Sequence, residues 1–391
     1  MTVSILDAQD LTKVNLSYKY DSKSEVHLQY AYAADDDKAV LFLKIGLERG
    51  ENELEDDYEL SYKTRNNYHG KVSSSQIITK DQFLKREDNH FHYQLDIPWT
   101  GEGLLVEIYM QNIKTKRQFF FDIPIKNEQS FSKTDLLFFE GDLPLFTSYA
   151  TTQQNLTLKP LLSTTDKVYC FKYAFDFTPA DLPMSERRTA SKKNMEIDSV
   201  FTINTNQPFN LNDEGLYFFQ KDTTKLEGMA IRITNEYYPK LARIDDLINP
   251  LIYISTGLEF KSLQNVTDKK EALDSYWWKM TKSRDRAKTI IRNYYNHVEK
   301  ANRLFTHYKE GWKTDQGMIF MIFGQPDEVY RTDNAETWIF NKKENFPKLK
   351  FTFAKVKNLF TANHYELVRS RSFERYWYQT VDLWRKGRKG I

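Results

Sequence analysis

The sequence predicts a β-rich protein of several domains, in which two antiparallel β-sandwich domains of immunoglobulin-like type precede an α+β domain. Three observations predict this fold class. The chain has 391 residues, which is more than one hydrophobic core usually serves, so roughly two to four domains are expected. Aromatic residues make up 15% of it, and aromatic side chains suit pleated, half-buried sheets. The hydrophobic period changes from strand-like to helix-like after residue 240.

The first predicted domain covers residues 12–127 and consists of β-type runs joined by polar turns. Residues 91–97 alternate well, with Phe91, Tyr93, Leu95 and Ile97 on one face and His92, Gln94 and Asp96 on the other. Such spacing with turn residues between the runs favours an antiparallel sandwich. The predicted strands are 26–31, 40–47, 91–97, 104–110 and 119–125.

The second predicted domain covers residues 128–240. Pro179, Pro183 and a charged run interrupt the pattern at 178–194, which predicts a long loop or a mobile hairpin tip. Cys170 is the chain's one cysteine, so no internal disulfide is possible, and its apolar surroundings predict a buried hydrophobic residue. The predicted strands are 136–139, 156–161, 168–177, 200–203, 216–219 and 229–233.

The third predicted domain covers residues 241–391. A helix is expected at 269–282, and a longer one at 284–310 has apolar residues at alternating steps of four and three. Gly311 suits the left-handed position just past a helix end. Helices followed by an antiparallel meander predict an α+β domain. The meander strands are expected at 318–323, 328–331, 337–340, 349–354 and 365–369.

Charge is unevenly distributed along the chain. Residues 270–391 hold 25 Lys and Arg against 14 Asp and Glu, a net charge of +11; because the whole chain carries +2, residues 1–269 carry −9. This asymmetry suggests an anionic partner for the last third, unless the two parts face each other or are both solvated. No window approaches 18 apolar residues, so no transmembrane helix is expected.

A short string between the long helix and the meander carries a family resemblance. Residues 311–315 read Gly-Trp-Lys-Thr-Asp, and residues 324–329 read Gly-Gln-Pro-Asp-Glu-Val. The chain thereby resembles the GWxTD-domain proteins of Bacteroidota, over roughly residues 245–370. Gln316 departs from the family, which often has Arg there. Further similar segments are Gly317, residues 250–256, Tyr294 with Tyr295, residues 301–305, and Trp338.

The resemblance implies a protein of the Bacteroidota cell envelope, located in the periplasm or at the outer membrane. Such proteins are often lipoproteins, and some are linked to gliding or secretion machinery. No enzymatic activity is established for the family, so the resemblance implies no catalytic residues. Residues 1–11 contain neither a basic nor an apolar export region. A cytoplasmic location is therefore the alternative to an envelope protein whose signal or lipid anchor has been removed.

The motif residues have a structural and a chemical interpretation. Trp312 can fasten the preceding helix to the sheet, and Trp312→Ala is expected to cost about 3–5 kcal/mol of stability. Thr314 and Asp315 can bond backbone N–H groups and shape the turn into the next strand. The alternative makes Asp315, Asp327 and Glu328 a carboxylate cluster for acid/base or metal chemistry in a hydrolase.

Other signals of chemistry are weak. His90 and His92 could form a metal pair, but two ligands alone make a poor site, so an exposed strand face is expected. Nucleotide-binding glycine motifs and the nucleophile-elbow motif are absent from the sequence. We therefore expect no metal, no cofactor and no enzymatic activity.

The C-terminal segment interleaves basic and aromatic residues. Arg375, Trp377 and Trp384 belong to it, and such a pattern can bind nucleic acid, anionic lipid head groups or an acidic protein surface. We expect its aromatic residues to dock on their own domain, with an envelope or protein contact as the next alternative and no nucleic acid. The candidate binding residues are Trp312, Thr314, Asp315, Asp327, Arg375, Trp377 and Trp384.

The sequence thus favours a non-enzymatic binding and scaffolding component of a cell-envelope assembly, namely outer-membrane, gliding or secretion machinery. Envelope proteins are the expected partners, because Tyr, Trp and Arg are enriched at protein interfaces. Carbohydrate or glycolipid binding is the alternative, and an uncharacterised hydrolase is a further one. Fold analogy alone does not decide between these three functions.

Overall fold

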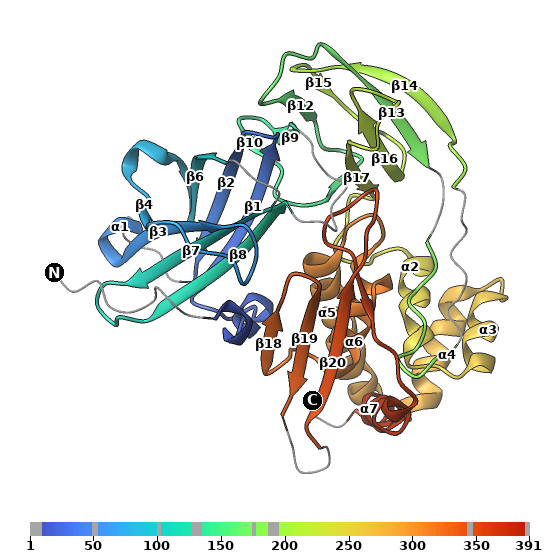
Figure 1. The fold of residues 1–391 in the computed structure, drawn as a ribbon. Helices are drawn as coiled ribbons and strands as arrows, with labels where there is room; N and C mark the ends of the chain where they lie inside the picture. The colour runs from blue at the N-terminus through green and yellow to red at the C-terminus, as the bar shows by residue number, and fades with distance from the viewer. Residues whose placement is uncertain are drawn as a thin grey trace.

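A computed structural model describes residues 10–48, 54–99, 103–126, 135–173, 177–186, 195–341 and 347–387. Two β-sandwich units occupy the first part of the chain, and a region of helices and one antiparallel sheet follows (Figure 1). The β-rich fold class predicted from the sequence is confirmed. Residues 187–194 of the predicted loop 178–194 lie outside the description, while residues 177–186 contain neither helix nor strand.

The first sandwich pairs two four-stranded sheets, ordered β1-β2-β6-β5 and β4-β3-β7-β8. Phe91, Tyr93, Leu95 and Ile97 are buried between the sheets, as their alternation predicts. β3, β4 and β5 were not predicted. The elements are β1 (Val26–Ala34), β2 (Lys38–Leu47), α1 (Leu54–Asp57), β3 (Tyr58–Arg65), β4 (Gln76–Ile77), a 3-10 turn (Lys80–Gln82), β5 (Phe83–Glu87), β6 (His90–Pro98), β7 (Leu104–Asn112) and β8 (Gln118–Lys126).

The prediction that His90 and His92 lie on an exposed strand face was wrong for His92. Its side chain is buried, whereas His90 is exposed, because Phe146 of the second sandwich covers that part of the face. The His92 and Phe146 rings lie 5.6 Å apart between centroids. Burial and, as the next largest cause, the positive charge of Lys44 lower the pKa of His92 to about 4. His92 is therefore neutral near pH 7.

The second sandwich pairs a four-stranded sheet, β10-β9-β12-β15, with a five-stranded one, β11-β17-β16-β13-β14. Cys170 is fully buried in its core, as predicted, and burial raises the pKa of its thiol. The strands are β9 (Leu136–Glu140), β10 (Leu143–Pro144), β11 (Tyr149–Thr151), β12 (Leu156–Pro160), β13 (Lys167–Tyr173), β14 (Ser199–Asn204), β15 (Pro208–Phe209), β16 (Gly215–Gln220) and β17 (Met229–Thr234).

The C-terminal region places helices against the sheet β18-β19-β20-β21 (Figure 1). Its core is rich in aromatic residues, with Trp338 and Tyr294 fully buried. The elements are α2 (Ile244–Ile248), a 3-10 turn (Asn249–Tyr253), α3 (Gly257–Gln264), α4 (Lys269–Thr281), α5 (Arg284–Phe305), η5 (Gly311–Lys313), α6 (Asp315–Phe323), β18 (Glu328–Arg331), β19 (Ala335–Phe340), β20 (Leu349–Lys355), β21 (Tyr365–Leu367), a 3-10 turn (Arg371–Phe373) and α7 (Glu374–Lys386).

Two local predictions in this region were wrong. Residues 318–323 form part of helix α6 instead of a strand, because an element buried on every side shows no period that separates helix from strand. Helix α5 ends at Phe305, five residues before the predicted end, and Gly311 begins the turn η5 without a left-handed backbone. Gly311 is therefore not the cap of that helix.

The C-terminal basic and aromatic segment forms helix α7, which docks on its own domain. Trp377 is buried in the core, and Trp384 donates from Nε1 to the carbonyl of Ile322 at 2.9 Å. Arg385 pairs with Glu259 at the start of α3. Across the described ranges, no helix has both the length and the apolar character needed to cross a membrane.

The N-terminal segment, residues 10–20, runs between the first sandwich and the C-terminal sheet. It contains two 3-10 turns, Leu11–Lys13 and Ser17–Tyr20. The N–H of Leu16 donates to the carbonyl of Val329 in β18 at 2.8 Å, and the Leu16 side chain is buried in the C-terminal core. The N–H of Val329 donates to Asn15 at 2.9 Å. This segment therefore extends the packing at the edge strand β18.

Candidate functional site

The Gly-Trp-Lys-Thr-Asp string lies in a tight turn between α5 and α6, and every residue from Gly311 to Gly317 is buried. Neither Gly311 nor Gly317 has room for a side chain. A Cβ added to Gly311 would overlap the carbonyl oxygen of Ala301 in α5, and one added to Gly317 would overlap the carbonyl oxygen of Gly311. The turn therefore presses directly against the backbone of α5.

Thr314 closes this turn and begins helix α6. Its Oγ1 donates to the carbonyl of Gly311 at 2.7 Å and accepts from the N–H of Gly317 at 2.9 Å. A Thr at this position satisfies one of the free N–H groups of the first helical turn. The predicted role of Thr314 as a backbone ligand is confirmed, although it caps a helix and not a strand.

Trp312 fastens α5 to the rest of the domain through both backbone and ring. Its N–H donates to Oδ1 of Asn302 at 3.1 Å, while Nδ2 of Asn302 donates to the carbonyl of Pro239 at 3.0 Å. Its ring is buried and meets Tyr253 edge-on at 6.2 Å between centroids. Trp312 is a core residue, as the sequence predicts.

Asp315 joins the turn to the last strand of the sheet. Its Oδ2 accepts from the N–H of Leu367 in β21 at 2.8 Å, and its carboxylate pairs with Arg369. Arg369 in turn donates to the carbonyl of Asp181 at 3.0 Å. The predicted bond of Asp315 to a backbone N–H is confirmed, but this N–H belongs to a distant strand, so the prediction that Asp315 shapes the turn into the next strand was wrong.

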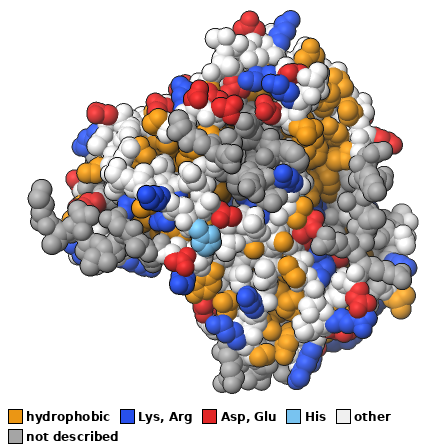
Figure 2. Space-filling model, viewed as in Figure 1, with side chains coloured by type: hydrophobic (Ala, Val, Ile, Leu, Met, Phe, Trp, Pro, Cys, Tyr) orange, Lys and Arg blue, Asp and Glu red, His pale blue; other side chains and the backbone are white. Residues whose placement is uncertain are grey.

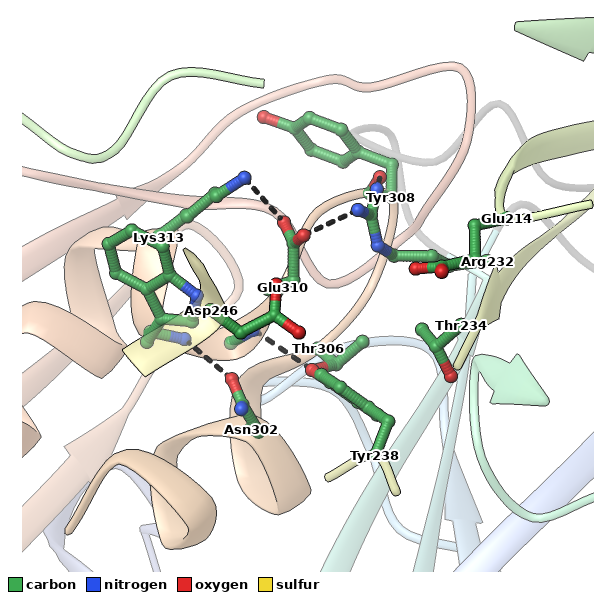
Figure 3. A network of polar contacts seen from close by, with 12 residues as sticks. Glu214, Arg232, Thr234, Tyr238, Asp246, Asn302, Thr306, Tyr308, Glu310 and Lys313 are labelled. Carbon is green, nitrogen blue, oxygen red and sulfur yellow. Dashed lines mark hydrogen bonds and ion pairs between the residues drawn. The ribbon is translucent and has the colours of Figure 1, made fainter. Parts of the chain in front are cut away.

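Glu310, just before the motif, connects it to the second sandwich (Figure 3). Its carboxylate lies 2.5 Å from Nη2 of Arg232 in β17 and 3.1 Å from Nζ of Lys313. Burial alone would raise the pKa of Glu310, but these two cations outweigh it and lower the pKa. Glu310 is therefore ionised and holds the junction by charge.

A cavity of about 250 Å³ lies beside this junction, between the second sandwich and the C-terminal region. It is lined by charged residues that already have partners, since Arg243 pairs with Glu214 and Asp246. Tyr238 also lines it and is hydrogen-bonded to Thr306. The cavity thus presents paired charges of both signs.

A second buried network joins the first sandwich to the C-terminal sheet. Arg331 in β18 donates to Asp122 of β8 at 2.8 Å and, from Nε, to Glu336 of β19 at 2.8 Å. Both carboxylates are fully buried. Burial would raise the pKa of Asp122, but Arg331 and Lys19 overcome this and hold the pKa well below its usual range.

Glu336 is the shared hydrogen-bond acceptor of this second network. Its Oε1 accepts from Gln316 at 2.9 Å, from Trp338 Nε1 at 2.7 Å and from the Tyr20 hydroxyl at 2.6 Å. Gln316 belongs to α6 and Tyr20 to the N-terminal segment. The network therefore ties the start of the chain and the first sandwich to the helix that follows the motif.

The structure does not bring Asp315, Asp327 and Glu328 together. Asp315 lies at the start of α6 and Asp327 beyond its end, and this nine-residue helix is about 13 Å long. Asp327 accepts from the N–H of Asn341, while Glu328 interacts with Tyr330 and Lys348. Across the described ranges, no group of three or more His, Cys, Asp or Glu residues lies close enough to hold a metal ion.

The remaining candidate binding residues differ in exposure. Arg375 and Asp327 are exposed, Trp384 is half-buried, and Trp377 is buried with Trp312, Thr314 and Asp315. Sequence reasoning missed the network residues Arg232, Asn302, Glu310, Arg331, Glu336 and Arg369. Of these residues, only Asn302 could have been singled out from the local sequence, because it is a polar residue beside the apolar stripe of α5.

Comparison with protein families finds a GWxTD domain at residues 215–386. The matched range begins in β16 of the second sandwich, so it includes Arg232, its partner Glu310 and the second cation beside Glu310, Lys313. A comparison with curated proteins finds no match.

Proposed function

We propose that this chain, which carries a GWxTD domain at residues 215–386, is a non-enzymatic scaffolding component of a Bacteroidota cell-envelope assembly. It would act at the periplasmic side or the outer membrane, in gliding or secretion machinery, by holding other envelope proteins in place. The observation that carries this proposal is the use of the motif side chains inside the protein. Trp312, Thr314 and Asp315 bond to the chain's own backbone and core.

The two buried charge networks support a fixed arrangement of the three units. Arg232 and Glu310 join the second sandwich to the C-terminal region of helices and sheet, and Asp122 and Arg331 join the first sandwich to the same region. Removing one partner of such a buried pair costs several kcal/mol, so the junctions resist separation. A scaffold needs this property, because it must present its surfaces at a constant spacing.

Helices α4 and α7 contact each other, and each exposes aromatic and basic side chains that would meet an anionic protein partner. Trp278 on α4 is 51% exposed and Tyr378 on α7 is 54% exposed. Lys279 and Arg375 are exposed beside them in sequence. Aromatic and cationic side chains of this kind are enriched in protein interfaces, and they suit the positive charge of the last third.

Co-purification from the native envelope tests this proposal. The tagged chain is expected to recover a stoichiometric envelope protein, and Trp278→Ser with Lys279→Glu and Arg375→Glu is expected to lose it. The matched control changes Ile77→Ser, Lys85→Glu and Lys114→Glu on the first sandwich, three exposed positions with the same change in charge. Recovery of the chain without any partner, or equal loss in both variants, contradicts the proposal.

A further inference from the structure

Strand β14 (Ser199–Asn204) forms an open edge of the five-stranded sheet. In the part of the chain that the structure describes, it pairs with β13 alone, and it lies at the outer margin of the second sandwich (Figure 1). Its sequence, Ser-Val-Phe-Thr-Ile-Asn, contains no charged residue and no proline. Edge strands commonly carry such residues to prevent pairing with other strands, so this edge is unprotected.

The edge is also apolar on its surface. Val200 is 55% exposed, Phe201 is 36% exposed, and Tyr169 on the neighbouring strand is 46% exposed. Hydrophobic side chains gather over this part of the molecule in Figure 2, at the upper right. An exposed apolar patch of this kind marks an interaction surface.

The face of the sheet that carries Val200 and Tyr169 already packs against other residues closer to the centre of the sheet. Tyr173, Leu216 and Phe218 are buried there against Leu359 and Phe360, which follow β20. The apolar face thus continues from an internal interface to the open edge at β14. A second strand added at the edge would extend this packing.

The hydrogen-bond pattern shows which groups of β14 are available. The N–H of Thr205 donates to the carbonyl of Asp166 at 3.0 Å, in register with the β13–β14 ladder. Because inward and outward groups alternate along an antiparallel strand, Ser199, Phe201 and Ile203 also bond toward β13. The N–H and C=O groups of Val200, Thr202 and Asn204 therefore point away from the sheet.

We propose that a second copy of this chain binds this edge, with β14 antiparallel to β14 across a two-fold axis and Thr202 opposite Thr202. New hydrogen-bonded pairs can form only between outward-pointing residues, so the axis can pass between two copies of Thr202. Centring it on Thr202 uses the whole strand, because Val200 then faces Asn204 and Phe201 faces Ile203. One sheet runs through both copies.

A second copy fits this edge because the register is self-complementary. No charged residue lies within the strand Ser199–Asn204, so no like charges oppose each other across the axis. Paired Thr residues and a Phe–Ile pair are favourable cross-strand neighbours. A two-fold axis requires one patch to match itself, as this one does. The contact is small, so a reversible, concentration-dependent dimer is expected.

Sedimentation of the full chain tests the dimer. The wild type is expected to show a monomer–dimer equilibrium, whereas Thr202→Lys and Thr202→Asp are each expected to be monomeric. An equimolar mixture of these two variants is expected to restore a dimer, because opposite charges then meet at the axis. Ser199→Lys is the matched control and keeps the dimer, since residue 199 lies at the end of the strand, away from the axis.

Disulfide trapping tests the register. Thr202→Cys is expected to form a covalent dimer, because opposed residues of an antiparallel pair lie about 5.5 Å apart between Cα atoms. Ser199→Cys is expected to remain uncrosslinked, since its two copies are about 20 Å apart. The native Cys170 is buried and does not interfere.

Four results would overturn the proposal. A wild type that stays monomeric at every concentration removes the dimer, and a dimer that survives Thr202→Lys lies elsewhere. Equal crosslinking at positions 199 and 202 excludes the register. If the purified wild type is monomeric and Thr202→Lys loses an envelope protein, the edge receives a foreign strand and the self-pairing is wrong.

Discussion

Gly317 is the position at which the motif turn tolerates least change. Its α-carbon faces the carbonyl of Gly311, and an added Cβ would overlap that oxygen. The backbone around it is held by Thr314 and by helix α5, so it has no room to relax. Gly317→Ala is expected to lower the free energy of unfolding by about 3 kcal/mol, as strong overpacking does. Urea unfolding measures this change.

Gly257→Ala serves as the control for that substitution. Gly257 begins helix α3, and no atom lies within 4 Å of the position that its Cβ would take. Alanine is the better helix former, so stability is expected to stay the same or rise by about 0.5 kcal/mol. Equal losses at Gly257 and Gly317 would show that the close approach at Gly317 is not the cause.

His92 predicts a pH dependence of stability. Its pKa is about 4 in the folded chain, first because of burial and then because of Lys44, against about 6.5 when unfolded. Between these values the unfolded chain binds more protons, so stability falls as pH falls from about 6.5 to about 4. The expected loss is on the order of 2 kcal/mol, measured by urea unfolding across that range.

His92→Gln isolates this contribution, because glutamine does not titrate. The variant is expected to lose less stability than the wild type between pH 6.5 and pH 4, even if it starts from a lower value. His69→Gln is the matched control, since His69 belongs to the same sandwich and is exposed. Parallel pH curves for the wild type and His92→Gln would contradict the argument.

At the scale of elements, the start of helix α6 depends on one hydroxyl. Thr314→Ala removes the acceptor of the Gly317 N–H and the donor to Gly311 in a buried turn. A lost cap costs about 1 kcal/mol, and the unpaired buried groups add about 1–2 kcal/mol. Thr314→Ser keeps the hydroxyl and is expected to recover most of the stability in thermal unfolding. If Ser behaves like Ala, the hydroxyl is not the cause.

Elements with one buried face were predictable from the sequence, and fully buried ones were not. The alternation at residues 91–97 and the stripe of α5 each mark an inside and an outside. Helix α6 has no outside, because all of its residues are buried. Its six apolar residues from Met318 to Phe323 therefore resemble a core strand, and only the cap at Thr314 indicates a helix.

The candidate site was predictable only in its local part. The burial of Trp312 and the backbone bonds of Thr314 follow from residue type and from the neighbouring helix. The partners of Asp315 do not, because Leu367 and Arg369 lie more than fifty positions further along the chain. A single sequence contains no spacing rule for such pairs, since the tertiary fold alone decides which charges meet.

At the scale of the whole molecule, the Asp122–Arg331 network decides whether the units unfold together. Arg331→Met leaves two fully buried carboxylates, Asp122 and Glu336, without their shared cation. Breaking a buried pair in this way costs about 3–5 kcal/mol. We expect calorimetry to show the first sandwich unfolding separately from the GWxTD domain in this variant, while the wild type unfolds more cooperatively.

An exposed ion pair supplies the comparison. Lys114 lies 2.8 Å from Asp57 on the surface of the first sandwich, and its side chain is mostly exposed. Lys114→Met is expected to change stability by less than about 1 kcal/mol and to leave the unfolding profile unchanged. A profile for Arg331→Met that matches that of Lys114→Met would mean that the buried network does not couple the units.

The contact of residues 10–20 with strand β18 has a consequence for the timing of biosynthesis. Asn15 bonds to Val329 across 314 positions of sequence. At about 5–20 residues per second, a ribosome needs roughly 15–60 s to make the residues between them. The first sandwich is complete once residue 126 is made, and from then until residue 331 is made its Asp122 has only Lys19 and Tyr68 as partners. Newly made chains therefore pass through a period in which the Asp122 carboxylate lacks its second cation, Arg331.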